Sequence, residues 1–221
     1  MKIICARENL LKGINIVSKA VPSKTTMDIL ECILIDATTD CIKLTGNDME
    51  LGIETKIEGS IIEKGMVAID SRIFGEIIRK LPENDVLIET GRTGEGIQSH
   101  IRCENSDFVI ACRDGDEFSF LPYIEKGESI RISQLTLKDI IRQTIFSIAA
   151  NENNKIMTGE LFEIKDNTLR VASLDGHRIS IRKVTLDNSY TDSKSMERYF
   201  QIRRLYGIFQ QLISWKGCSH R

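Results

Sequence analysis

Asp48 and Glu50 lie two residues apart in a polar stretch and could serve as a general acid and a general base. The same stretch is typical of a turn before a strand, which is the simpler interpretation. The segment 91–96 is rich in glycine, as phosphate-binding loops are, but it lacks the Lys-Ser/Thr that such loops require. We interpret this segment as the loop of a hairpin.

The cysteines and histidines form no metal or nucleophile pattern. The six cysteines are scattered, with no Cys-x-x-Cys pair and no histidine close by: Cys5, Cys32, Cys41, Cys103, Cys112 and Cys218. None of the histidines, His100, His177 and His220, stands near a Ser, Cys and acid in a recognisable nucleophile context. We therefore expect a non-catalytic protein with small buried thiols, no cofactor, no bound metal and a cytoplasmic location.

Charge is balanced over the whole chain but is unevenly distributed along it. The 30 basic and 32 acidic residues give a net charge of −2, which provides no general attraction to nucleic acid. The strand regions carry much of the acid: Glu54, Glu58, Glu63, Glu83, Asp85 and Glu89. Basic residues gather in the expected helices: Lys12, Lys19, Arg72, Arg79, Lys80, Lys138 and Arg142. Such helices could touch phosphates on one face, although ordinary solvated helix faces would look the same.

Hydrophobic periodicity predicts an α+β fold for the first half of the chain. Apolar residues have helical spacing over 10–21, where Pro22 ends the helix. They have it again over 73–81, where Ser71 can cap the start and Pro82 ends the helix. Short β-branched or alternating segments predict mostly antiparallel strands: 29–35, 41–44, 51–58, 66–69, 86–89, 100–103 and 108–112. No apolar run approaches the ~18–20 residues of a membrane span, so we expect no membrane partner.

The pattern then begins again in the second half of the chain. Shifted by 127 positions, four segments match in residue character and order: Ile29-Leu30 with Ile156-Met157, Leu34-Ile35-Asp36 with Leu161-Phe162-Glu163, Ile42-Lys43-Leu44 with Leu169-Arg170-Val171, and Asp48 with Asp175. A duplicated domain explains this order, and two coincidentally similar α+β stretches are the alternative. The same shift predicts that a complete second unit would extend roughly 30 residues beyond Arg221.

One motif in the second half differs from the other turns. Within the segment 169–180, two expected strands are joined by Asp175-Gly176, which is a turn signal. His177 and Arg178 follow directly, and a turn alone requires neither of them. A surface hairpin with solvated polar residues is the alternative interpretation.

An ordered series of motifs runs from Met1 to about Lys194. They are Met1-Lys2-Ile3 with Glu8-Asn9-Leu10-Leu11-Lys12, then Leu44-Thr45-Gly46-Asn47-Asp48-Met49-Glu50, Leu81-Pro82, Phe118-Ser119-Phe120-Leu121-Pro122, Gly159-Glu160-Leu161-Phe162-Glu163 and Leu174-Asp175-Gly176-His177-Arg178. Together they resemble the bacterial DNA polymerase III beta subunit, the sliding clamp. The resemblance implies an α+β DNA-clamp fold, with repeated domains that each have two helices packed on antiparallel sheets. In that family three such domains form a protomer, and two protomers close head to tail around duplex DNA.

The resemblance also implies which residues meet DNA and protein partners. Lys24, Arg72 and Arg79 stand at basic DNA-contacting positions of the family. The second-domain part of the pocket for short hydrophobic partner peptides matches six residues: Met157, Leu174, Gly176, His177, Arg178 and Ile179. The implied partners are duplex DNA and peptides of the replicative polymerase and the clamp loader. Basic inner helices would attract DNA weakly, and enclosure by the ring would keep the clamp on it.

After Lys194 the sequence departs from the family pattern. We expect residues 1–125 to form the first clamp domain and residues 126–221 an incomplete second domain, with an off-pattern tail from about 195 and no third domain. In the tail the apolar residues keep helical spacing: Tyr199, Ile202, Leu205, Tyr206, Phe209, Leu212 and Ile213. A helix or a shifted reading frame would each explain this stretch.

A chain without the third domain would lack half of the peptide pocket and one ring-closing interface. We therefore expect no closed homodimer ring from this chain. Two alternatives to a clamp stay open at this point. One is a stand-alone duplex DNA-binding module, and the other is an enzyme that uses Asp48, Glu50 or His177.

Overall fold

The chain divides into two compact units in the computed structural model. The first unit is Met1–Tyr123 and the second unit is Ile124–Arg221. The structure describes residues 1–49, 51–94, 96–119, 121, 132–149, 155–186 and 196–200. Within these ranges, no helix is long and apolar enough to cross a membrane.

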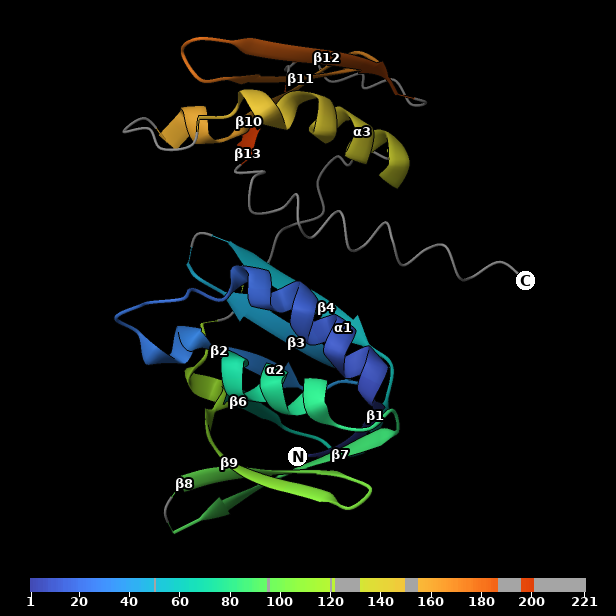
Figure 1. Ribbon diagram of the computed structural model, residues 1–221, viewed down its shortest axis with the longest axis vertical. Helices are drawn as coiled ribbons and strands as arrows, with labels where there is room; N and C mark the ends of the chain where they lie inside the picture. Colours follow the sequence, from blue (N-terminus) through green and yellow to red (C-terminus); the bar gives the residue numbers. More distant parts are fainter. Residues whose placement is uncertain are drawn as a thin grey trace, which may run out of the picture. The chain divides into compact units, whose positions relative to one another are not determined.

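The first unit is one curved antiparallel sheet carrying two helices (Figure 1). The strands are β1 (Lys2–Ala6), β2 (Cys32–Asp36), β3 (Ile42–Asn47), β4 (Gly52–Ile57), β5 (Ser60–Glu63), β6 (Met66–Asp70), β7 (Asp85–Thr93), β8 (Gly96–Cys103) and β9 (Ser106–Asp114). The helices are α1 (Arg7–Val17) and α2 (Ser71–Lys80), with short 3-10 turns η1 (Ser18–Ala20), η2 (Asp28–Glu31) and η3 (Gly115–Glu117). The strand order is β4-β3-β2-β6-β9-β8-β7-β1-β5.

Alternate strand residues pack under the two helices and form the main core. Ile33 and Ile35 of β2 are fully buried in this core, as is Leu10 of α1. Phe74 and Ile78, four residues apart on α2, are also fully buried there. The remaining strand residues point to the opposite face of the sheet, which we call the far face.

Polar contacts at both ends hold α1 and α2 antiparallel. At one end, Arg7 donates from Nε to the Ile78 carbonyl at 3.1 Å and from a terminal nitrogen to the Arg79 carbonyl at 2.7 Å. At the other end, the hydroxyls of Ser18 and Ser71 are 3.4 Å apart. Arg7 thus supplies donors and positive charge to carbonyls that the end of α2 leaves unpaired.

The second unit repeats half of this design. Its elements are α3 (Gln134–Thr144), η4 (Ile145–Ser147), η5 (Lys155–Thr158), β10 (Glu160–Lys165), β11 (Thr168–Leu174), β12 (Ile179–Thr185) and β13 (Met196–Phe200). The strand order β12-β11-β10-β13 is that of β4-β3-β2-β6. The pair Leu34–Thr45 recurs as Leu161–Ala172, and Asn47–Gly52 recurs as Leu174–Ile179. The 127-residue shift found in the sequence is therefore confirmed in the strand register.

The start of the tail is a strand, so the helix expected from Tyr199 onward is wrong for its first residues. β13 pairs antiparallel with β10, and Phe200 lies opposite Glu160 as Ile69 lies opposite Ile33. Backbone pairing with a sheet edge that lacked a neighbour overrides the helical spacing of the side chains. The rest of the tail expectation lies outside the described residues.

Several boundaries in the first unit also differ from the sequence expectations. The α-helix expected up to residue 21 ends at Val17 and is followed by the 3-10 turn η1, and the segment 91–96 expected as a hairpin loop belongs mostly to β7, which ends at Thr93, and to β8, which begins at Gly96. The cap of α2 is Asp70, whose carboxylate accepts from the backbone nitrogens of Arg72 and Ile73, while Ser71 is the first helical residue. Residues 29–31, the start of the segment 29–35 expected as strand, belong instead to the 3-10 turn η2 (Asp28–Glu31). Strands β1 and β5 were not predicted from the sequence, because each is short and pairs only with strands that are distant in the sequence.

A buried polar cluster distinguishes the core of the second unit from that of the first. Glu160 is fully buried, and its Oε1 accepts from the Thr144 hydroxyl at 2.9 Å, while its Oε2 has no hydrogen-bond partner among the described residues. Ser173 donates to the Thr144 carbonyl at 2.5 Å. The register places Glu160 where the first unit has the apolar Ile33. Burial raises the pKa of the Glu160 carboxyl from 4.5 to about 7.

We predict that the second unit loses stability as pH rises from about 4.5 to about 7. Below this window the carboxyl is protonated in both states, whereas inside it only the unfolded chain ionises, which favours unfolding. The shift corresponds to about 3 kcal/mol. Hydrogen exchange of β10 and β11 amides, corrected for intrinsic rates at each pH, measures the opening free energy.

Glu160→Gln should abolish this part of the pH dependence. Glu58→Gln, at an exposed position of the first unit, is the matched control and should leave it unchanged. An opening free energy that does not fall between pH 5 and pH 7.5 in the unmodified chain would contradict the prediction.

Candidate nucleic-acid and peptide sites

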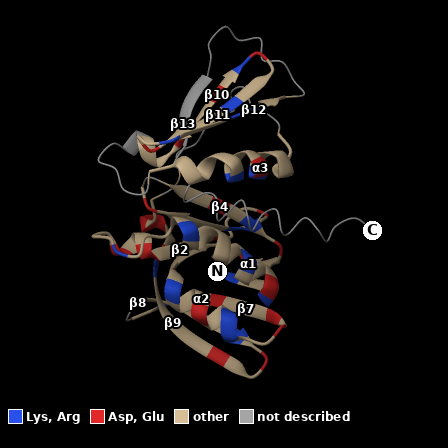
Figure 2. Ribbon diagram, turned by 45° about the horizontal axis from the view of Figure 1, so that its top comes forward, with Lys and Arg blue, Asp and Glu red and all other residues tan. Residues whose placement is uncertain are grey.

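The exposed basic residues of α2 form the first candidate site. Arg72 and Arg79 are seven residues apart, so they share one helix face, and both are exposed. Neither guanidinium has an ion pair with a carboxylate in the described part of the chain. Together α1 and α2 carry five basic and two acidic residues, and Figure 2 shows both kinds of charge on the pair.

Lys24 lies apart from these arginines. It is exposed in the loop between η1 and η2, and the described structure gives its ammonium no ion pair. No hydrogen bond or ion pair among the described residues joins Lys24 to Arg72 or Arg79, so the three predicted DNA residues do not form one cluster.

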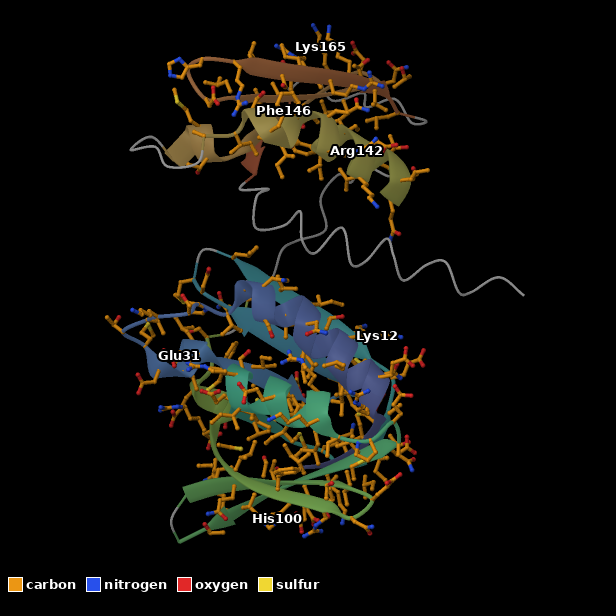
Figure 3. The ribbon with its side chains drawn as sticks, viewed as in Figure 1. Lys12, Glu31, His100, Arg142, Phe146 and Lys165 are labelled. Atoms are coloured by element: carbon orange, nitrogen blue, oxygen red, sulfur yellow. The ribbon has the colours of Figure 1, made fainter. Side chains whose placement is uncertain are left out.

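Other basic residues of the helices are partly neutralised by neighbours. Lys12 of α1 pairs with Glu8 at 2.5 Å, and Arg142 of α3 pairs with Asp139 at 3.6 Å. Figure 3 labels Lys12 and Arg142 on their helices. Because each charge has a carboxylate within one helical turn, these residues are weaker candidates for phosphate contact than Arg72 and Arg79.

The second candidate site is built on the turn between β11 and β12. The Asp175 carboxylate accepts from the backbone nitrogens of His177 and Arg178, both at 3.1 Å, and from Arg178 Nε at 2.7 Å. Gly176 has a φ of +84°, which favours glycine. The Arg178 side chain and the turn amides hold the pKa of the Asp175 carboxyl below its usual range. Asp175 therefore organises the turn, and sequence reasoning had left it out of the site.

The same turn occurs in the first unit, which explains the acidic pair singled out in the sequence. The backbone nitrogen of Asp48 donates to the Leu51 carbonyl at 3.1 Å, as that of Asp175 does to Arg178 at 3.2 Å. The Asp48 carboxylate accepts from the Leu51 nitrogen at 2.7 Å. Asp48 is thus a turn residue, as the simpler interpretation predicts, and Glu50 lies outside the described residues.

Five of the six predicted pocket residues lie on this one hairpin. Leu174 and Ile179 are cross-strand partners that flank the turn, and their side chains are 41% and 61% exposed. Met157 comes from η5, where its side chain is half-buried and its carbonyl accepts from the Ala149 nitrogen at 3.0 Å. Ile181, 47% exposed, continues the apolar row on the same face and was missed. Because Ile181 is two residues after Ile179 on the same strand, this spacing could have placed both side chains on one face of the sheet.

Solved structures with this fold are sliding clamps. The crystal structure of a Eubacterium rectale protein assigned as a DNA polymerase III beta subunit matches with a TM-score of 0.88 and 57% identity, covering 96% of this chain and 56% of that one. The Bacillus subtilis DNA polymerase sliding clamp matches with a TM-score of 0.85 and 30% identity, covering 94% and 56%. The fold is therefore the α+β DNA-clamp fold.

Sequence comparison gives the same family. Residues 1–122 match the N-terminal domain of the DNA polymerase III beta subunit, and residues 131–196 match its central domain. The beta sliding clamp of Halalkalibacterium halodurans is 36% identical over 197 residues, 86% of this chain and 51% of that protein. The chain belongs to the DNA polymerase III beta subunit family. It spans about half the length of the curated relatives it matches.

Substitutions at the second position of the two equivalent turns test their geometry. Gly176→Ala should destabilise the second unit by about 1 kcal/mol, because its φ of +84° disfavours a side chain. Met49, at a φ of +72°, occupies the equivalent position, so Met49→Gly should be neutral or stabilise the first unit by up to about 1 kcal/mol. Urea unfolding measures both, and a Met49→Gly loss as large as the Gly176→Ala loss would contradict the prediction.

Proposed function

We propose that this chain is part of a DNA sliding clamp, a processivity factor that encircles duplex DNA and tethers the replicative polymerase. The single observation that supports this most is family membership over two successive clamp domains with matching strand register. In this function the protein is a non-catalytic subunit that works in the cytoplasm. The polymerase catalyses DNA synthesis, and the clamp raises the effective concentration of the polymerase at the DNA.

In this function, Lys24, Arg72 and Arg79 are the residues that contact DNA. A sliding ring needs attraction to phosphates without recognition of bases. Exposed guanidinium groups without a competing carboxylate suit that need, because each can release counterions from the duplex. The expected binding is weak, independent of sequence and strongly dependent on salt.

In this function, partner peptides of the polymerase and the clamp loader bind to the β11–β12 hairpin of the second unit. Leu174 and Ile179 offer apolar surface, and Met157 adds an adaptable side chain. Gly176 allows close approach of a peptide backbone. His177 and the terminal nitrogens of Arg178 can donate to peptide carbonyls or carboxylates. A peptide without Leu or Phe should bind poorly, because the apolar row provides most of the contact area.

The edge of β9 supports head-to-tail assembly of complete clamps. Only Arg113 and Asp114 of β9 pair with β6, while Ser106–Cys112 pair on one side, with β8. No strand of the described residues covers the other side of that stretch. Phe108 and Val109 there are 39% and 54% exposed. An open strand edge with exposed apolar residues is suited to pairing with another chain.

The stand-alone duplex DNA-binding module is the alternative function. It predicts submicromolar binding to short linear duplex, whereas a sliding clamp should bind such DNA weakly and lose it by about 0.2 M salt. Family membership over two successive clamp domains favours the clamp.

The double variant Arg72→Ala, Arg79→Ala should weaken binding to a 20-base-pair duplex at low salt. The slope of log binding constant against log salt should fall by about 1 for each arginine removed. Fluorescence anisotropy with duplexes of different sequence measures this, and the loss should be equal for all of them. Lys56→Ala, on the far face of β4, is the matched control, and an equal loss there would contradict the assignment of α2.

Ile179→Ser should weaken binding of a fluorescent peptide from the clamp-binding segment of the replicative polymerase at least fivefold. The substitution removes exposed apolar area, so the fold should be unchanged. Val109→Ser, also exposed and apolar but on β9, is the matched control. Unchanged peptide affinity in Ile179→Ser would exclude this hairpin as the peptide site.

A further inference from the structure

A row of polar side chains crosses the helix side of the sheet in the second unit. Ser173 of β11 lies opposite Ser180 of β12 in the strand register. Glu160 of β10 lies beside Ser173, because the next pair along these strands is Leu161 with Ala172. Glu160 and Ser173 are buried, and Ser180 is half-buried. Three neighbouring strands therefore present polar side chains on the same side of the sheet.

The end of α3 and the turn η4 bind this row. The Thr144 carbonyl, at the last residue of α3, accepts from the Ser173 hydroxyl at 2.5 Å, and the Thr144 hydroxyl is 2.9 Å from Glu160 Oε1. In η4, the Ser147 hydroxyl is 2.6 Å from the Ser180 hydroxyl. We call these five residues the polar seam: Thr144, Ser147, Glu160, Ser173 and Ser180. The polar seam joins the end of the helix to three strands by hydrogen bonds.

All contacts of the polar seam can be made at once only when Glu160 carries a proton. The Thr144 hydroxyl is also 2.9 Å from the Ile140 carbonyl, and a carbonyl can only accept a hydrogen bond. A hydroxyl has one proton, so it cannot donate fully to the Ile140 carbonyl and to a Glu160 carboxylate at the same time. A protonated carboxyl can donate to the hydroxyl instead, and both contacts are then made. Proton loss therefore weakens one contact and leaves a charge in the core.

The first unit has apolar residues and a glycine at the five equivalent positions. They are Val17, Ala20, Ile33, Gly46 and Ile53. A Cβ added at Gly46 would overlap the Val17 carbonyl, so the helix end there lies directly on the strand. The repeated fold therefore forms without a polar seam, and the second unit has one that its packing does not require.

Two residues of the polar seam are chain neighbours of the candidate peptide site. Ser173 directly precedes Leu174, and Ser180 directly follows Ile179. Because side chains alternate along a strand, each serine points to the helix side while its apolar neighbour points to the opposite face. A movement of the polar seam therefore moves the surface at which we place partner peptides.

The turn η4 connects the polar seam to a third residue of the peptide site. Ser147 is the last residue of η4 and lies two residues before Ala149. The Ala149 backbone nitrogen donates to the Met157 carbonyl at 3.0 Å. Separation of η4 from the sheet would therefore move Met157 relative to the hairpin.

The described side chains bring no opposite charge to Glu160. Burial raises the pKa of its carboxyl to about 7, and the Thr144 hydrogen bond acts in the opposite direction. The charged residues of the elements packed around it are Lys138, Asp139 and Arg142 of α3, Glu163 and Lys165 of β10, Arg170 of β11, Arg182 and Lys183 of β12, and Glu197 and Arg198 of β13. Strand alternation turns four of them to the opposite face: Glu163, Lys165, Arg170 and Lys183. Arg182 is exposed, and Arg142 pairs with Asp139.

We propose that the polar seam positions the peptide-binding hairpin from the helix side of the sheet and makes peptide binding depend on a proton at Glu160. With the proton in place, the polar seam holds the hairpin and η4 together. When the proton leaves, the carboxylate draws in water, the end of α3 separates from β10 and β11, and the apolar surface loses its alignment. The proposal rests on the proposed function for its ligand, and Glu160 acts as a positioning residue that does not touch the peptide.

Peptide affinity should therefore fall as pH rises through about 7. Fluorescence anisotropy with the labelled polymerase peptide measures Kd at pH 6.0 and pH 8.5 for the unmodified chain and for Glu160→Gln, which is always neutral. We expect Kd to rise at least about fivefold more in the unmodified chain, because a carboxyl with a pKa of about 7 is almost fully ionised at pH 8.5. The comparison removes any contribution of His177, which both proteins keep.

Glu58→Gln is the matched control and should behave like the unmodified chain. If Glu160→Gln does not fold, as judged by circular dichroism, Glu160→Ile replaces it, because the first unit has isoleucine at this position. Equal pH dependence in the unmodified chain and in the Glu160 variant would overturn the proposal.

Ser147→Ala separates positioning from a general loss of stability. This variant removes the contact between η4 and β12 and leaves Glu160 in place. It should weaken peptide binding at least about threefold at pH 6.0 and much less at pH 8.5, where the polar seam is already released. Ser60→Ala, at an exposed position of β5, is the matched control. An equal loss at both pH values in Ser147→Ala would overturn the proposal.

A measurement without peptide separates this inference from the proposed function. In a two-dimensional NMR pH titration of the unmodified chain, the amides of residues 147–149 should shift with a midpoint near pH 7, and Glu160→Gln should abolish this shift. Failure of the polymerase peptide to bind at every pH would count against the proposed function. The NMR titration would then decide the inference alone, and the absence of a shift that depends on Glu160 would overturn it.

Discussion

The alternation of side chains along paired strands is the constraint on which the rest of each unit depends. Once Ile33 and Ile35 are buried under the helices, Cys32 and Leu34 must point to the other face. The helices then carry exposed charge on their outer side, and the far face is where we propose that protein partners bind. A slip of one residue in β2 would exchange the two faces, so the fold and both candidate sites depend on the same register.

The duplication shows how one framework can carry different chemistry. The first unit has Ile33 in its core, whereas the second unit places Glu160 at the equivalent position, where one carboxylate oxygen has no partner within the described part of the unit. An unpaired buried carboxylate costs stability when it ionises, so the second unit is the one whose stability should respond to pH near neutrality.

Much of this arrangement was predictable from sequence, and the reasons for the misses are physical. The spacing in α1 and α2, the 127-residue shift and the Asp-Gly turn are local signals, and the structure confirms each of them. β1 and β13 depend on pairing with distant strands, which no local window contains. Asp175 was not predicted as a site residue, because its carboxylate accepts from backbone amides and the sequence does not show this contact. Ile181 was not predicted, because the predicted site ended at Ile179. The roles of Lys24, Arg72 and Arg79 stay predictions.

In the proposed function, duplex DNA contacts the helix side of the repeated fold, and partner peptides contact the far face of its sheet. A two-dimensional NMR titration of the unmodified chain tests it, first with a 20-base-pair duplex at low salt and then with the polymerase peptide. We predict that the duplex shifts resonances of α2 and the Lys24 loop, and that the peptide shifts resonances of 174–181. Overlapping sets of shifted residues, or duplex-induced shifts centred on the β11–β12 hairpin, would contradict it.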